Sequence, residues 1–216
     1  MNPVLHLPRI TAAQLSAHSF EVVREFLPPS AAPLVQQILA EVPCLVVPVK
    51  TRKSKHGDHR PGHYDRFSQI TVNVCGNSYQ FLITLLHELA HAAIHAQHGL
   101  RVQPHGREWK RCFADYLRRA WDLFPADLQI PLRRQFPLPS SSSFRDVALQ
   151  QALRKYDTLD ERPMVAELPT GTLFSLDGKR IFRLGPQLRS CFRCNTLEGK
   201  VYRVAGSARV QTIYTE

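Results

Sequence analysis

The segment Phe81–His95 constrains the fold most. When it is placed on a helix at about 100° per residue, apolar side chains cover most of the circumference. A narrow polar strip remains, which consists of Thr84, His87, Glu88, His91 and His95. The pattern therefore predicts a buried core helix. Titratable groups on such a helix cost free energy unless something pairs with them.

His87 and His91 are four residues apart, so a helix brings both imidazoles to one face, one turn apart. With Glu88 beside them they form the H-E-x-x-H pattern, in which the histidines bind zinc and the glutamate is a general base. A metal is the partner that would offset the burial of the strip. The alternative is a hydrogen-bonded core cluster in which Glu88 accepts from the two histidines.

A tetrahedral catalytic zinc needs a third protein ligand and one position for water. His95 and His98 lie too far along a straight helix, which rises about 1.5 Å per residue, to share an ion with both motif histidines. His105 is the better candidate, because a second helical pattern opens directly after it at Gly106. Glu108 could be a carboxylate ligand and ranks below His105. We expect that His95 and His98 do not bind the metal themselves, and that they either contact the residues that do or face solvent.

The residues before the motif predict short elements around it. A capping box at Thr11–Gln14 opens a helix to about Phe26, and a second helix ends near Glu41. β-Branched runs at Cys44–Val49 and Gln69–Val74 predict two strands with a loop between them. This order of elements predicts an α+β fold in which the motif helix packs on a small sheet.

The sequence around the motif resembles a known family. The run Ile83–Ala92, followed by His105–Lys110, is similar to the SprT-like zinc metallopeptidases, which include the Spartan DNA–protein crosslink proteases. Ile70–Asn73 also resembles the strand before the active-site helix of this family, so the likeness covers about residues 40–125.

This resemblance has implications for fold and chemistry. It implies a minimal zincin-like domain and the degradation of proteins that are bound or crosslinked to DNA. It also implies one zinc ion per chain, held by His87, His91 and His105, with Glu88 as the catalytic base.

The net charge of +10 indicates polyanionic partners. In the first half of the chain, basic residues gather between the two predicted strands: Lys50, Arg52, Lys53, Lys55, Arg60 and Arg66. A basic loop of this kind, with glycines in it, can bind phosphates. Lys50, Arg52, Lys53 and Lys55 are therefore candidate nucleic-acid contacts. The alternative is a solvated loop with no partner.

The composition changes near residue 139. Pro137–Ser143 has the composition of a linker, and Phe144–Tyr156 predicts a helix. Further on, alternating residues are separated by turn signals at Asp177–Gly178, Gly185–Pro186, Glu198–Gly199 and Ala205–Gly206, which predicts four or five short strands. We expect a peptidase-like domain at 1–139, a linker and helix at 140–163, and a small all-β module at 164–216.

The predicted C-terminal strands are basic and aromatic. Arg180, Arg183, Arg189 and Arg203 are candidate nucleic-acid contacts. Phe174, Phe182, Phe192 and Tyr202 could stack on bases, as in small barrels that bind single strands, or fill the core of the module.

Cys191 and Cys194 form half of the zinc ribbon that ends many bacterial SprT-like proteins. No cysteine or histidine follows Cys194, so we expect a module without zinc.

Three functions fit these patterns. The first is a zinc-dependent endopeptidase for proteins on DNA, with nonspecific DNA contacts. The second is a DNA- or RNA-binding protein with a structural or idle zinc site, and the third is a general peptidase independent of DNA. Glu88 favours a peptidase, because a structural site has no reason to keep a carboxylate beside the metal.

The sequence also indicates a location. No apolar run approaches the roughly 20 residues of a membrane span, and Met1–Ile10 lacks a signal-peptide pattern. The odd number of cysteines argues for reduced thiols. We therefore expect a cytoplasmic protein without a membrane partner, associated with the nucleoid if it binds DNA.

Overall fold

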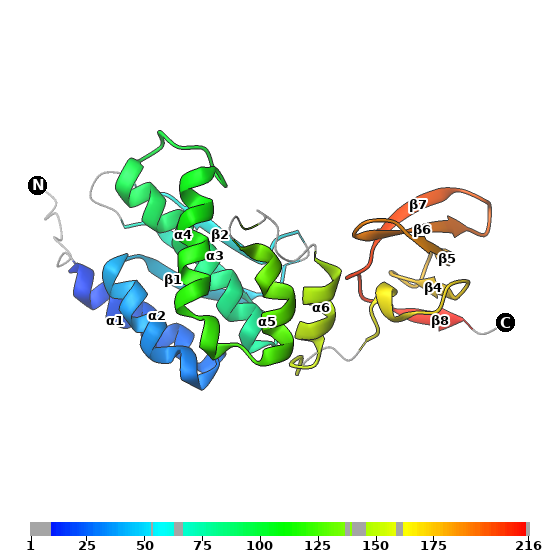
Figure 1. The fold of residues 1–216 in the computed structure, drawn as a ribbon, viewed down its shortest axis with the longest axis horizontal. Coiled ribbons are helices and arrows are strands. Elements are labelled where there is room, and N and C mark those ends of the chain that lie inside the picture. The colour runs from blue at the N-terminus through cyan, green and yellow to red at the C-terminus, as the bar shows by residue number, and fades with distance from the viewer. Residues whose placement is uncertain are drawn as a thin grey trace, which may run out of the picture. The chain divides into compact units, whose positions relative to one another are not determined.

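The structure is a computed structural model that describes residues 10–52, 54–62, 67–136, 139, 146–158 and 162–214. It forms two compact units, Met1–Phe124 and Pro125–Glu216, and its helices and two sheets confirm the α+β class (Figure 1). Lys53, Arg66 and the linker residues Ser140–Ser143 lie outside the described residues. The domain boundaries expected at residues 139 and 163 stay predictions.

Two helices open the first unit. α1 (Ala12–Val23) begins at the predicted capping box, in which the Thr11 hydroxyl accepts from the Gln14 N–H and the Gln14 side chain accepts from the Thr11 N–H. A 3-10 turn at Arg24–Phe26 follows α1 directly. A second turn, Pro29–Ala31, leads into α2 (Ala32–Glu41).

The sheet of the first unit has the order β1-β3-β2. β1 (Leu45–Lys50) runs parallel to β3 (Gln69–Val74), and β2 (Gly57–Arg60) pairs antiparallel with the other side of β3. The prediction of an uninterrupted loop between β1 and β3 is wrong, because β2 lies within it. Buried Asn73 supports β2, since its amide donates to the Lys55 carbonyl at 2.7 Å and its N–H to the His56 carbonyl at 2.8 Å.

The predicted core helix is α3 (Ser78–His98). The Asn77 side chain accepts from the Gln80 N–H at its start, and Gly99, with φ 61°, ends it. α3 contacts β2 and β3 and also packs against α4 (Arg107–Arg119) (Figure 1). A short 3-10 turn, Trp121–Leu123, follows α4. Among the described residues, none of the helices has the length and apolar character needed to cross a membrane.

The described residues of the second unit form two short α-helices and a sheet. The helices are α5 (Ala126–Leu132) and α6 (Val147–Arg154), with 3-10 turns at Arg133–Gln135 and Val165–Glu167. The antiparallel sheet has the order β7-β6-β5-β4-β8. Its strands are β4 (Leu173–Ser175), β5 (Ile181–Gln187), β6 (Cys191–Thr196), β7 (Val201–Ala205) and β8 (Thr212–Tyr214).

The turn predicted at Gly185–Pro186 is wrong, because both residues lie inside β5. The pairing register with β6 shifts between Leu184 and Gln187. Gly185 lies so close to β6 that an added Cβ would be 2.4 Å from the Arg193 carbonyl oxygen. Glycine is therefore required here for strand contact and not for a chain reversal.

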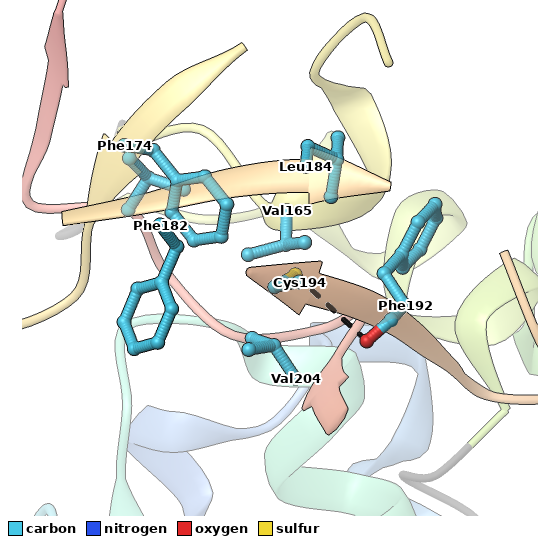
Figure 2. Packing of buried hydrophobic residues seen from close by; sticks show 8 residues of the cluster. Val165, Phe174, Phe182, Leu184, Phe192, Cys194 and Val204 are labelled. Atoms are coloured by element: carbon cyan, nitrogen blue, oxygen red, sulfur yellow. Dashed lines mark hydrogen bonds between the residues drawn. The ribbon is translucent and has the colours of Figure 1, made fainter. Parts of the chain in front are cut away.

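The aromatic residues of the second unit form its core. Phe174, Phe182 and Phe192 are buried together with Val165, Leu184, Cys194 and Val204 (Figure 2). Half-buried Tyr202 packs edge-on against Phe182, with ring centroids 5.6 Å apart. The three phenylalanines are thus core residues and unavailable for base stacking.

Candidate metal centre

Three histidines meet at one point. His87, His91 and His105 each bring a ring nitrogen within 4.8 Å of the others. Nε2 of His105 lies 3.0 Å from Nε2 of His91 and 3.3 Å from Nε2 of His87. A tetrahedral zinc with bonds of about 2.0–2.1 Å holds nitrogen ligands roughly 3.3 Å apart, so the spacing fits a single ion. No other cluster of potential ligands in the described ranges has this spacing.

The three histidines have two different backbone conformations. His87 and His91 follow from the helical spacing of α3. His105 precedes α4 and has a φ of 59°, in the left-handed region that non-glycine residues rarely adopt. The adjacent Gly106 N–H donates to the Gln103 carbonyl at 2.9 Å, which closes a tight turn around His105. The sequence indicated the place of His105 before α4, but not this backbone conformation.

One aromatic side chain of α4 contacts all three imidazoles. The ring of buried Trp109 has its centroid 4.6 Å from those of His87 and His105 and 5.1 Å from that of His91. Phe113, one turn later, lies 5.3 Å from His87. These aromatic residues exclude water from one side of the centre. The sequence pattern indicated them only as the buried face of a helix.

Burial sets the protonation of the ligands. Burial, together with the neighbouring imidazoles, lowers the pKa of His87 and the pKa of His91 to about 3. Burial also lowers the pKa of His105. The three rings are therefore neutral at pH 7 and have the lone pairs that a metal needs.

Glu88 lies beside the histidines but outside the cluster that could hold a metal. Its side chain is buried, and burial together with the nearby Asp58 carboxylate raises its pKa to about 8, against the opposing charges of Arg52 and Lys55. The backbone of Gly57 covers it. A Cβ on Gly57 would lie 2.5 Å from Glu88 Oε1 and 2.7 Å from its Cγ, so only glycine fits at this place in β2.

His59, two residues along β2, also lies over α3. Its ring is stacked on His91 at a centroid distance of 6.1 Å, and the His95 ring lies 5.9 Å away. Its Nε2 is buried without a hydrogen-bond partner among the described residues. Gly57 and His59 were both missed as site residues, since a polar run between basic residues gave no strand signal.

The remaining histidine and carboxylate candidates stay outside the cluster. His95 lies beside the site and His98 is exposed at the end of α3. Glu108 is partly buried in the first turn of α4 and does not belong to the metal-compatible group.

Two of the basic candidates near β2 have partners within the protein. Arg52 Nε donates to Asn73 Oδ1 at 2.8 Å, and Lys55 Nζ lies 2.9 Å from Asp58 Oδ1. Lys50 is exposed, and Lys53 lies outside the described residues. The charges of Arg52 and Lys55 also lower the pKa of Glu88, against the effect of its burial.

The basic candidates of the second unit are exposed. Arg183 and Arg203 lie on the solvent side of β5 and β7, and Arg189 lies in the turn after β5. The Arg180 guanidinium lies over the Tyr202 ring, 5.2 Å from its centroid.

Neither of the cysteines of the half-ribbon belongs to a metal-compatible group in the described part of the chain. Cys191 and Cys194 are three residues apart on β6, which directs their side chains to opposite faces of the sheet. The thiol of buried Cys194 donates to the Phe192 carbonyl at 3.8 Å (Figure 2).

A trio of neutral imidazoles on and beside a buried helix, with a buried carboxylate next to it, is an arrangement that could hold one metal ion. In a comparison with known families, residues 54–121 match the SprT-like family. The resemblance seen in the sequence is confirmed, and the matched segment includes the three histidines, Glu88 and β2. No curated protein and no solved structure gives a significant match to the chain.

Proposed function

We propose that the protein is a zinc-dependent endopeptidase that acts on proteins bound or crosslinked to DNA. The observation that carries this proposal is the position of Glu88, which is buried beside three neutral imidazoles without joining their cluster. A buried carboxylate that is not a ligand is costly. A catalytic centre needs one as a base, whereas a structural metal site does not.

In this proposal the histidines would hold one zinc ion per chain and leave a fourth position for water. A bound zinc supplies Lewis-acid polarisation of a carbonyl and lowers the pKa of a coordinated water. Glu88 takes the proton of the attacking water and passes it to the amine nitrogen as the peptide bond breaks. Its raised pKa makes the Glu88 carboxylate a stronger base than that of an exposed glutamate.

The sheet supports a polypeptide substrate. β2 stands at one edge of the order β1-β3-β2 and covers Glu88. Backbone groups on the outer side of an edge strand can pair with an extended peptide, which would bring a peptide bond next to the metal centre. An extended substrate is a locally unfolded one, so the proposed activity is directed at flexible segments of the target protein.

The second unit supports a DNA partner. Arg193 on β6 pairs directly opposite Arg203 on β7, and both side chains are exposed. Like charges directly across a sheet are destabilising unless anions lie between them. The phosphates of nucleic acid would supply those anions without regard to base sequence. Arg193 was not among the residues singled out from the sequence, and its register opposite Arg203 is visible only in the sheet.

The test is cleavage of a DNA-binding substrate protein by the purified chain, with and without single-stranded DNA. We expect cleavage that DNA accelerates, and a decrease of at least about 100-fold in Glu88→Gln, the scale of general-base removal. Glu88→Gln should keep its zinc. Glu108→Gln is the matched control and should retain activity.

Two results would replace this proposal. Equal cleavage with and without DNA would indicate a general peptidase. Zinc and DNA binding without any cleavage would indicate a nucleic-acid-binding protein with an idle metal site.

A further inference from the structure

A cavity of about 160 Å³ lies beside the candidate metal centre. Its lining comes from β2, the C-terminal part of α3, the segment 99–104 and Trp109 of α4. His91, one of the three clustered histidines, forms part of the wall. A group that enters the cavity is therefore held within contact of a proposed metal ligand.

The lining selects for one kind of group. Ile94, Val102 and Pro104 contribute apolar surface, and among the described residues the lining contains no Asp, Glu, Lys or Arg. A charged group placed here would lose its hydration without gaining an ion pair. The volume suits a single side chain and not a segment of chain. The cavity thus fits one aliphatic or aromatic side chain.

One polar atom at this cavity lacks a partner. His59 lines the cavity, and its Nε2 is buried without a hydrogen bond to any residue that the structure describes. Buried polar atoms in folded proteins are nearly always hydrogen-bonded, so an unpartnered one beside a cavity indicates a ligand that completes the bond. A peptide group can do this, because it offers both a donor and an acceptor.

We propose that this cavity binds one apolar side chain of the polypeptide substrate, next to the bond that is cleaved, and that His59 hydrogen-bonds to the peptide group of the same residue. This inference rests on the proposed peptidase function and adds its side-chain specificity. The apolar residue would occupy a fixed position relative to the cut, because the cavity and the metal centre share His91.

The test uses the zinc-loaded full chain and four unstructured peptides that differ at one residue: Leu, Phe, Lys or Asp. We expect kcat/KM to be roughly 10- to 100-fold higher for Leu and Phe, with the cut at a constant distance from that residue by mass spectrometry. Binding of the same peptides to Glu88→Gln, followed by fluorescence anisotropy, gives a second readout that needs no hydrolysis.

Different substitutions test the apolar lining of the cavity and the Nε2 atom of His59. Val102→Asp should abolish the preference for Leu and favour Lys by about tenfold, because it places an acid in the cavity. Ile130→Asp, an equivalent change at a 72% exposed position of α5, should leave the preference unchanged. His59→Phe keeps an aromatic ring but removes Nε2. It should therefore weaken the binding of all four peptides by the same factor. Zinc content is measured for every variant.

The outcomes distinguish the cavity from the peptidase function. Equal cleavage of the four peptides, or no effect of Val102→Asp, overturns the cavity proposal and leaves the peptidase in place. Selective binding of the Leu and Phe peptides without cleavage supports the cavity and overturns the peptidase. Neither cleavage nor selective binding overturns both.

Discussion

The two units use the same types of residue in opposite ways. In the first unit, Trp109 and Phe113 pack on imidazoles, and Arg52 and Lys55 act on the pKa of Glu88. In the second unit, the phenylalanines close an apolar core and the arginines of the strands face outward. The first unit thus directs polar chemistry to its interior, whereas the second presents charge at its surface.

The two units also differ in the kind of polar group that they bury. Glu88 is buried in the first unit, while the buried polar residues described in the second unit are the neutral Gln135, Ser175 and Thr196. Burying an ionisable group costs stability, and folded proteins keep such groups where function needs them. Under the proposed function, the chemistry belongs to the first unit and the DNA contacts to the second, a division that substitutions in each unit can test.

The largest effect should come from removing a metal ligand. We expect about one equivalent of zinc in the wild type, and near-complete loss of zinc and of peptide hydrolysis in His87→Ala, His91→Ala or His105→Ala. Cys191→Ser and Cys194→Ser in the second unit should keep the full zinc content, as should His95→Ala. Elemental analysis of the purified variants decides this. Full retention of zinc in His105→Ala would show that another residue is the third ligand.

A second prediction compares two glycines. Gly57→Ala should displace the Glu88 side chain and lower peptide hydrolysis by about 10- to 100-fold with zinc retained, because its Cβ would overlap the carboxylate. Gly185→Ala should instead weaken the pairing of β5 with β6, since its Cβ would meet the Arg193 carbonyl. Its hydrolysis of a small unstructured peptide should be unchanged. Equal activity of Gly57→Ala and wild type would remove Gly57 from the site.

A third prediction compares two sets of cations. Replacing Arg180, Arg183, Arg189 and Arg203 together by glutamine should reduce the slope of log K for single-stranded DNA against log[salt]. The expected reduction is roughly one unit for each phosphate that the variant no longer neutralises. Hydrolysis of a small peptide should not change. A slope that does not respond would leave these arginines as a solubility feature.

The control in the first unit is the double variant Arg52→Gln with Lys55→Gln. It should have little effect on the slope of log K for single-stranded DNA against log[salt]. Both cations lower the pKa of Glu88, so their removal should shift the acidic limb of the kcat/KM profile to higher pH. A pH profile identical to that of the wild type would show that Arg52 and Lys55 do not influence the pKa of Glu88.

The smallest effect concerns pH and stability without metal. The pKa of Glu88 is raised from 4.5 to about 8 by folding, so the folded state binds more protons between these values and loses stability as the pH rises through them. Removing this group in Glu88→Gln should make the metal-free protein about 3 kcal/mol less sensitive to a change from pH 5 to pH 8.

Urea unfolding followed by tryptophan fluorescence measures this effect in the first unit, which contains both tryptophans of the chain, Trp109 and Trp121. His87 and His91 act with the opposite sign at lower pH. Their pKa values fall from 6.5 to about 3 on folding, so they add stability as the pH rises from about 3 to 6.5. Identical pH dependence in wild type and Glu88→Gln would contradict the burial of an ionisable carboxyl.

The sequence predicts those parts of the molecule whose residues act through local spacing. The apolar periodicity of α3 and the capping box at Thr11 need only neighbours in the chain. β2 was missed because Gly57–Arg60 has neither β-branched residues nor apolar alternation, and it is held instead by Asn73 and by pairing with β3.

The contacts of the site depend on tertiary structure in the same way. The fit of Gly57 over Glu88, and of Trp109 against three imidazoles, appears only when separate elements meet. The match to the family confirms the resemblance of the motif segment. The zinc, the DNA and the substrate stay predictions.

The place of His105 has a consequence for the folding of the chain. Two of the imidazoles come from one helix and are in position once α3 has formed, whereas the third depends on the tight turn before α4. A chain in which that turn is open would retain two ligands, too few to hold a catalytic zinc. The proposed peptidase activity would then appear only when the connection between α3 and α4 is complete, so that a partly folded copy would be inactive.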